Sequence, residues 1–176
     1  IGGIRDGINR KESHDALHKR AIEVIDAAAA AGAPNVIALS GERKGMADAM
    51  GADNCVEFFN RIKGHAEAKG VTICLELLNS KVNHPDYMCD HTAWGVDVMK
   101  RVNSPRIKLL FDIYHMAIME GDLIRTIRAN IQWIGHFHTA GNPGRNQLDD
   151  TQEINSPTKG ADPIRCLEQA VEIFDV

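Results

Sequence analysis

The chain has 176 residues, of which 44% are hydrophobic, and this is sufficient for one folded domain with a substantial core. Its 20 basic and 24 acidic residues are interspersed and give a net charge of −4, which argues against a nucleic-acid-binding face. No apolar run approaches the roughly 20 residues that span a bilayer, and no export signal opens the sequence, so we expect a cytoplasmic protein without a membrane segment.

The first half of the chain predicts two helix-strand units. In the first unit, Ser13 is placed to cap a helix that Gly32 ends, and a strand follows at residues 35–40. The second helix, DNCVEFFNRIKGHAEAKG, ends at Gly70 and leads into the strand VTICLELLN. The apolar face of the first helix is formed by Leu17, Ala21, Val24, Ile25 and Ala28.

The second half repeats this alternation. HTAWGVDVMKRVNSP predicts a helix before the strand RIKLLFDIYH, and GDLIRTIRANI predicts a helix before the strand QWIGHFHTAG. After a polar loop, DPIRCLEQAVEIF predicts a last helix that Asp162 and Pro163 begin. Nearly continuous apolar strands separated by helices are typical of parallel strands covered on both faces, so the fold class is α/β.

Two architectures fit this alternation, an open doubly wound sheet and part of a (β/α)8 barrel. A barrel uses about 31 residues per unit over a typical length of about 250 residues, so a chain of this length supplies only part of one. Periodicity alone does not choose between the two architectures. The residues at the ends of the strands favour the barrel.

Three successive strands end in a side chain that can bind a metal ion: Glu76 in CLELL, Asp112 in LLFDI and His138 in GHFHT. In a barrel these ends converge on one face. A single carboxylate there is usually a helix cap or half of an ion pair, but charged groups inside apolar runs are costly to bury unless they are paired or coordinated. We therefore predict a shared site for a divalent ion, and two oxygens with one imidazole suit Mn²⁺, Mg²⁺ or Co²⁺.

The four cysteines do not suggest an alternative metal site. Cys55, Cys74, Cys89 and Cys166 show no CxxC spacing. We expect them to be reduced and mostly buried, without a zinc site or a disulfide framework.

The motifs CLELLNSK, FDIYHMAIMEGDL, GHFHTAGNPGR and QEIN resemble the hydroxypyruvate isomerase branch of the xylose isomerase-like barrel superfamily. That superfamily also holds ketose 3-epimerases and apurinic endonucleases. The resemblance implies that residues 1–176 form a single (β/α)8 barrel domain, present as an incomplete portion of about four strands with flanking helices and truncated at both ends. It also implies that a fourth metal ligand, which is the second catalytic carboxylate, lies beyond the C-terminus of this chain.

The same resemblance assigns roles to individual residues. Glu76, Asp112 and His138 would hold the divalent ion, and Glu76 would also transfer a proton. His115 would contact a substrate oxygen, with capping or packing as its alternative role. Arg145 would also bind the substrate, because its guanidinium can pair with both oxygens of a carboxylate. Its alternative role is a solvated loop charge. Glu153 would touch the substrate or order its loop.

These roles lead us to expect a metal-dependent isomerase that interconverts hydroxypyruvate and tartronate semialdehyde through an enediolate. The alternatives are a ketose 3-epimerase or another sugar (phosphate) isomerase or epimerase, and a non-catalytic metal- or ligand-binding barrel. The expected partners are a small hydroxycarbonyl acid or sugar, with neither nucleic acid nor membrane. Exposed sheet edges leave two further options open, a second copy of the chain or additional residues that cover them.

Overall fold

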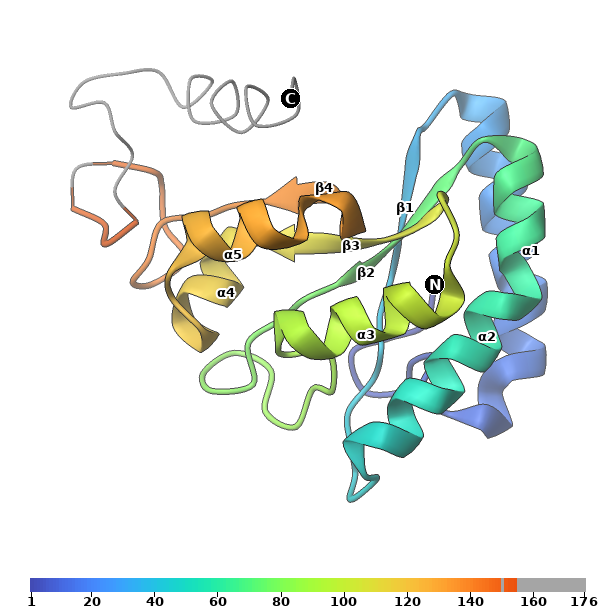
Figure 1. Ribbon diagram of the computed structural model, residues 1–176, viewed down its shortest axis with the longest axis horizontal. Coiled ribbons are helices and arrows are strands. Elements are labelled where there is room, and N and C mark those ends of the chain that lie inside the picture. The colour runs from blue at the N-terminus through green and yellow to red at the C-terminus, as the bar shows by residue number, and fades with distance from the viewer. Residues whose placement is uncertain (150, 155–176) are drawn as a thin grey trace.

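The computed structural model describes residues 1–149 and 151–154 (Figure 1). A four-stranded sheet lies at its centre, with strand order β1-β2-β3-β4 and every neighbouring pair parallel. The strands are β1 (Asn35–Ala38), β2 (Thr72–Glu76), β3 (Ile107–Asp112) and β4 (Ile134–His138). The α/β class and the four predicted strands are therefore confirmed, whereas the helix predicted after Asp162 lies outside the described residues.

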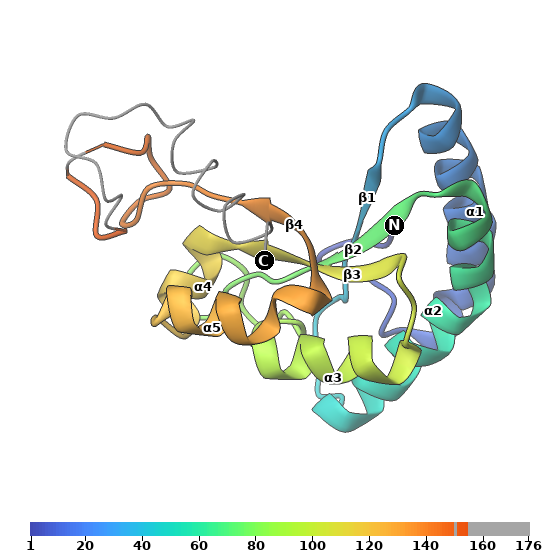
Figure 2. The same cartoon turned by 45° about the horizontal axis from the view of Figure 1, so that its top comes forward.

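The main helices form an arc along one side of this sheet (Figures 1 and 2). They are α1 (His14–Ala31), α2 (Asp48–Lys69), α3 (Thr92–Val102), α4 (Ile113–Met119) and α5 (Leu123–Asn130), with short 3₁₀ turns at Lys11–Ser13 and Ile131–Trp133. Strands added in one direction by crossovers of the same hand place all their helices on one face. The expectation that both faces are covered is thus wrong for the described residues, because Gly135 is exposed and His136 and His138 are only half-buried.

Two glycines end the long helices where the sequence predicted. Gly32 after α1 and Gly70 after α2 adopt left-handed φ angles of 69° and 71°, and their backbone N–H groups bind carbonyls of the last turn. Ser13 is not the predicted cap, because its side chain makes no capping hydrogen bond and the 3₁₀ turn leads into α1 instead. Both helix ends are followed within a few residues by the next strand.

The core lies between the helices and the covered face of the sheet. Cys55 and Cys89 belong to this core, and Cys74 is buried on the opposite face of β2. All three are free and buried, as predicted, and Cys166 lies outside the described residues. In the part of the chain that the structure describes, no helix has the length and hydrophobicity to cross a membrane. The fully buried side chains include Ile25, Phe58, Phe59, Ile62, Ile73, Leu75, Met99, Leu109 and Phe111.

Glycine at two positions allows close packing around β3. A Cβ at Gly95 in α3 would lie 2.8 Å from Cδ2 of Leu109 and 3.3 Å from its Cδ1, so the glycine lets α3 approach the sheet. Gly135 is the extra residue of a bulge, since Leu109 pairs with Ile134 and the next residue of β3 pairs with His136. A Cβ at Gly135 would lie 2.8 Å from Cβ of Lys108.

We predict that Gly95→Ala lowers the free energy of unfolding by about 1–3 kcal/mol, because the new methyl group overlaps buried Leu109. Gly64→Ala is the matched control, since Gly64 is also inside a helix but has no atom within 4 Å of its would-be Cβ. The control should raise the free energy of unfolding by about 0.5–1 kcal/mol through helix propensity alone. Urea denaturation measures both, and equal effects of the two substitutions would contradict the close packing.

Candidate functional site

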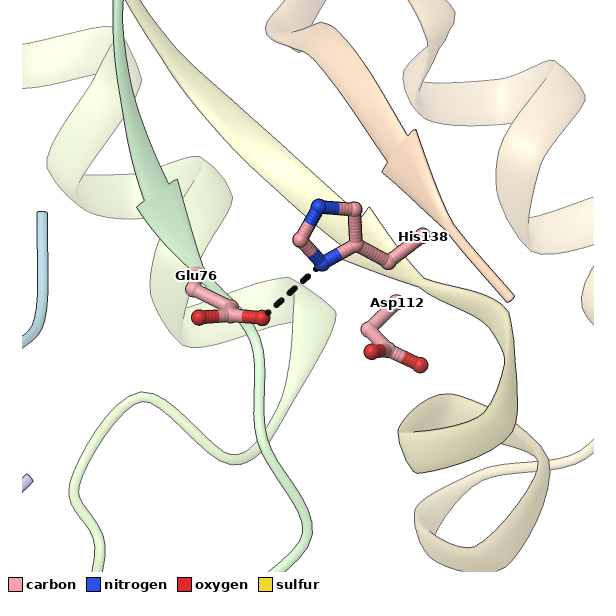
Figure 3. A group of neighbouring side chains, drawn as sticks. All are labelled: Glu76, Asp112 and His138. Atoms are coloured by element: carbon pink, nitrogen blue, oxygen red, sulfur yellow. Dashed lines mark ion pairs between the residues drawn. The ribbon is translucent and has the colours of Figure 1, made fainter. Parts of the chain in front are cut away.

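The three residues predicted to share a site lie together at one edge of the sheet. Glu76, Asp112 and His138 are the last residues of β2, β3 and β4, and Asp112 pairs in register with His138. One ligand atom from each residue lies within 4.8 Å of the other two. In Figure 3, Glu76 and His138 point toward each other while Asp112 lies beside them, with 3.3 Å between Glu76 Oε1 and His138 Nδ1.

Both carboxylates of this triad are partly removed from water. Burial raises the pKa of Glu76, although the nearby His138 acts in the opposite direction. Burial also raises the pKa of Asp112, which is only 3% exposed, although the His115 N–H and the His138 charge oppose the shift. An ionised carboxylate in such surroundings has lost most of the water that would stabilise its charge. A bound cation would provide that stabilisation instead.

The donor set of the triad fits a divalent cation. Two carboxylates and one imidazole offer hard oxygen donors with one nitrogen, which suits Mg²⁺, Mn²⁺ or Co²⁺ better than a site built from thiolates. Three ligands from rigid strand ends also leave coordination positions for a substrate. The residues present would therefore hold such an ion.

His115 is placed by the start of α4. The strand β3 passes directly into this helix, and Asp112 caps it by accepting a hydrogen bond from the His115 backbone N–H at 3.1 Å. The imidazole is fully buried, and burial, with help from Arg145 and His84, lowers the pKa of His115 to about 3. His115 is thus a neutral ring beside Asp112 at physiological pH.

Arg145 lies in the loop that follows β4. An antiparallel bridge between Gly141 and Asn146 closes this loop, and the guanidinium lies over the ring of Tyr114 with 5.6 Å between Cζ and the ring centre. Its positive charge reaches the triad, since it opposes the rise that burial causes in the pKa values of Glu76 and Asp112. Arg145 is itself exposed and therefore accessible to an anionic ligand.

Glu153 supports the Arg145 loop in the structure. Its backbone N–H donates to the carbonyl of Asn142 at 2.6 Å, and its carboxylate accepts a bond from the Asn142 amide at 3.4 Å. These contacts fit the loop-ordering role. A direct contact of Glu153 with substrate remains a prediction.

Sequence reasoning missed several residues around the triad. Asn79 binds the ring of His115, and the OH of Tyr114 donates to Oδ1 of Asn83 at 2.9 Å. The ring of His84 lies 5.3 Å from that of His115. The largely polar run NSKVNH, two residues after the end of β2, was the available signal, because loops at the carboxyl ends of parallel strands form the sites of barrels.

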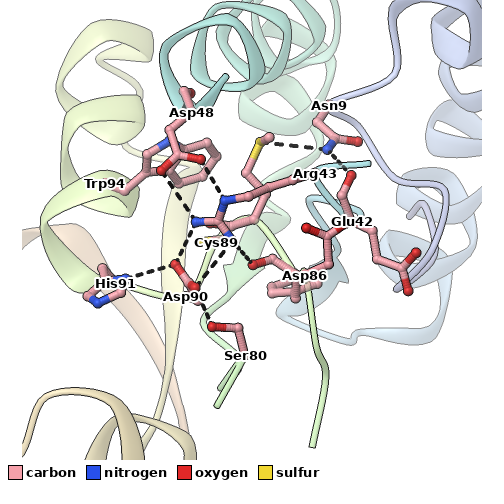
Figure 4. A network of polar contacts seen from close by, with 12 residues as sticks. Asn9, Glu42, Arg43, Asp48, Ser80, Asp86, Cys89, Asp90, His91 and Trp94 are labelled. Atoms are coloured by element: carbon pink, nitrogen blue, oxygen red, sulfur yellow. Dashed lines mark hydrogen bonds and ion pairs between the residues drawn. The ribbon is translucent and has the colours of Figure 1, made fainter. Parts of the chain in front are cut away.

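A second polar cluster at the same edge is satisfied internally (Figure 4). Arg43, from the loop after β1, binds Asp90 at 3.0 Å and Asp48 at 2.6 Å, and Asp90 also accepts bonds from Ser80 and His91. Burial alone would raise the pKa of Asp90, but these donors outweigh it and lower that pKa. The Arg43–Asp90 cluster therefore joins two loops and does not offer a free ligand.

The fold agrees with comparisons to known proteins. A model of the xylose isomerase-like TIM barrel family matches residues 6–164. The chain is 35% identical over 77 residues to hydroxypyruvate isomerase of Escherichia coli (strain K12) and 36% identical over 73 residues to 2-oxo-tetronate isomerase of Cupriavidus necator. These matches cover 42% of this chain but only 30% and 28% of those proteins.

A solved structure, that of AP endonuclease, family 2 from Brucella melitensis, has a similar fold. The TM-score is 0.78 at 27% identity, and the match covers 89% of this chain and 58% of that protein. The parallel sheet with its outer helices is accordingly a portion of a TIM barrel.

We predict that Asp112→Asn lowers the affinity for Mn²⁺ by more than the roughly 10- to 100-fold that is lost when a group supporting a metal ligand is removed. The same change should raise the free energy of unfolding of the metal-free protein at neutral pH. A carboxyl group whose pKa is raised by folding opposes folding when ionised, and this penalty disappears as the pH falls below its unfolded-state pKa.

Calorimetric titration with Mn²⁺ and urea unfolding in the presence of a chelator measure the two effects. Asp149→Asn is the control, because Asp149 is exposed and its pKa is lowered by hydrogen bonds from Thr151. Asp149→Asn should bind Mn²⁺ with the parent affinity, and its free energy of unfolding should not rise. An Asp112→Asn protein that keeps the parent affinity would remove Asp112 from the metal site.

Proposed function

We propose that this chain, which belongs to the xylose isomerase-like TIM barrel family, is part of a metal-dependent isomerase that interconverts hydroxypyruvate and tartronate semialdehyde. The observation that carries the proposal is the convergence of Glu76, Asp112 and His138 at the carboxyl ends of adjacent strands. The identity to an isomerase named for hydroxypyruvate supports the choice of reaction.

The reaction moves one hydrogen between neighbouring carbons. In hydroxypyruvate, the CH₂OH carbon loses a proton, and its electron pair forms the C=C bond of an enediolate while the ketone oxygen gains charge. Return of a proton to the former ketone carbon, with transfer of the hydroxyl proton from the other oxygen to the former ketone oxygen, gives the aldehyde and the new hydroxyl group of tartronate semialdehyde. A divalent cation held by Glu76, Asp112 and His138 would make the C–H more acidic and stabilise the charge on the two oxygens.

Glu76 would move the carbon-bound proton. Its carboxylate is half-buried, and one oxygen is directed at His138 at 3.3 Å. A general base in this position typically contributes about 10²- to 10⁴-fold to the rate. Delivery of the proton to the adjacent carbon by the same carboxylate requires no other donor, because the two carbons are one bond apart.

His115 and Arg145 would bind the two ends of the substrate. A neutral, buried imidazole can donate one hydrogen bond to a substrate oxygen near Asp112 without bringing a second charge to the metal site. The guanidinium of Arg145, held over Tyr114, can pair with both oxygens of the substrate carboxylate. A carboxylate on the substrate is therefore part of the proposal.

A four-carbon substrate is the second candidate. The 36% identity to 2-oxo-tetronate isomerase favours a longer 2-oxo acid with the same 2-oxo-3-hydroxy unit. Comparison of kcat/KM for hydroxypyruvate, 2-oxo-tetronate and a neutral ketohexose with the full-length protein decides among the candidates. Turnover of the ketohexose alone would favour an epimerase, and metal binding without turnover of any of them would favour a non-catalytic barrel.

We predict that Glu76→Gln in the full-length protein reduces kcat on hydroxypyruvate by about 10²- to 10⁴-fold, because the amide cannot accept the carbon-bound proton. Exchange of the substrate hydrogen with D₂O, followed by NMR, should disappear in parallel. Glu57→Gln is a matched control, since Glu57 pairs with Lys11 on the surface of α2. Continued exchange at the parent rate in Glu76→Gln would assign the proton transfer to another group.

We predict that Arg145→Ala reduces kcat/KM for hydroxypyruvate by at least 10-fold, because the substrate carboxylate loses its charged partner. Affinity for Mn²⁺ should change far less, since Arg145 is not a ligand. Arg125→Ala is the control, because Arg125 pairs with Asp122 on α5. Equal losses for hydroxypyruvate and for a neutral substrate would show that Arg145 does not read the carboxylate.

A further inference from the structure

Asn79, in the loop after β2, contacts the ring of His115 at its Nδ1 atom. The Asn79 backbone N–H donates to Nδ1 of His115 at 3.1 Å, and the Nδ2 atom of its side chain lies 2.6 Å from the same nitrogen. Both residues are fully buried. The contact joins the β2–α3 loop to α4 directly beside Asp112.

The orientation of the Asn79 amide is set by its other neighbours. Its Oδ1 accepts hydrogen bonds from the backbone N–H groups of Val82 at 3.1 Å and Asn83 at 2.8 Å. Its Nδ2 also donates to Oδ1 of Asn83 at 2.7 Å. Because a backbone N–H can only donate, the amide oxygen must face these two groups, and the NH₂ group faces His115.

These donors determine which nitrogen of His115 carries the proton. Nδ1 accepts a hydrogen bond from a backbone N–H, so the proton of the neutral ring is on Nε2. Nε2 is buried and has no hydrogen-bond partner among the described residues. The Oδ2 atom of Asp112 is 3.8 Å away, which is too far for a hydrogen bond.

We propose that Asn79 is a positioning residue for the reaction, which fixes His115 in the Nε2–H form so that this N–H donates to a substrate oxygen beside Asp112. A buried donor without a partner is uncommon in folded proteins and is explained when a ligand supplies the acceptor. The proposal rests on the proposed function for the identity of the substrate. The hydrogen-bond arrangement itself does not depend on it.

The first test observes the tautomer without requiring activity. In the metal-free protein with ¹⁵N-labelled histidine, long-range ¹H–¹⁵N correlation spectra should show a protonated Nε2 and an unprotonated Nδ1 for His115, assigned by loss of its signals in His115→Gln. Asn79→Asp has nearly the same shape but places a carboxylate oxygen near Nδ1. It should draw the proton to Nδ1. A parent protein with the proton on Nδ1, or a variant with an unchanged pattern, overturns the proposal.

The second test asks whether the tautomer matters for turnover. Asn79→Asp in the full-length protein should lower kcat on hydroxypyruvate by about 10²-fold, the loss typical of one hydrogen-bond donor to a developing oxyanion. Affinity for Mn²⁺ should remain within about threefold of the parent, because the amide does not touch the three ligands. Asn79→Ala retains the backbone donor, so it should keep the tautomer. Its kcat on hydroxypyruvate should fall less than that of Asn79→Asp.

The controls separate this inference from folding and from the proposed function. Asn54→Asp also removes a part-buried amide donor, to the carbonyl of Asn9 at 2.8 Å, and should change neither the tautomer nor kcat. If Asn79→Asp does not fold, Asn79→Ala takes its place, and a kcat on hydroxypyruvate equal to that of the parent overturns the positioning role. A parent protein that turns over none of the candidate acids overturns the proposed function, whereas a changed tautomer with unchanged kcat overturns the positioning role alone.

Discussion

The site depends on a single junction, at which Asp112 is both the last residue of β3 and the cap of α4. The hydrogen bond from the His115 N–H to Asp112 Oδ1 begins the helix, fixes the carboxylate and buries the imidazole one turn later. Parallel pairing with β2 and β4 then places Glu76 and His138 on either side of that carboxylate. The junction therefore places a proposed metal ligand, Asp112, and a proposed substrate contact, His115, within one turn of each other at this edge of the sheet.

Two buried aspartates at this edge differ in how their charge is compensated. Asp90 and Asp112 are both nearly inaccessible to solvent, at 4% and 3% exposure. The pKa of Asp90 is lowered because donors from Arg43, Ser80 and His91 outweigh the effect of burial, whereas the pKa of Asp112 is raised because burial dominates. The charge of Asp90 is compensated by hydrogen bonds and an ion pair within the protein. A carboxylate left without a full charge partner is typical of a site that receives one from a ligand.

Local patterns in the sequence were enough to predict the strands, the helix ends at Gly32 and Gly70, and the three strand-end side chains that lie together. These features depend on periodicity, on glycine conformations and on the rule that parallel strands share their carboxyl edge. The helix α4 was missed because DIYHMAIM reads as a continuation of the strand until Asp112 is seen to cap it. The bulge at Gly135 and the contacts of Asn79 depend on residues distant in sequence, which no local pattern records.

The β2–α3 loop connects the two halves of the proposed site. Tyr87, near its end, donates to the backbone carbonyl of Glu76 at 3.0 Å, and Asn79, near its start, holds His115. Between them, Asn83 accepts the hydrogen bond of Tyr114, whose ring lies under Arg145. The strand ends thus fix the proposed metal ligands, while this loop fixes the groups that would contact the substrate. Substitutions within the loop would therefore change the proposed substrate contacts and leave the three proposed metal ligands in place.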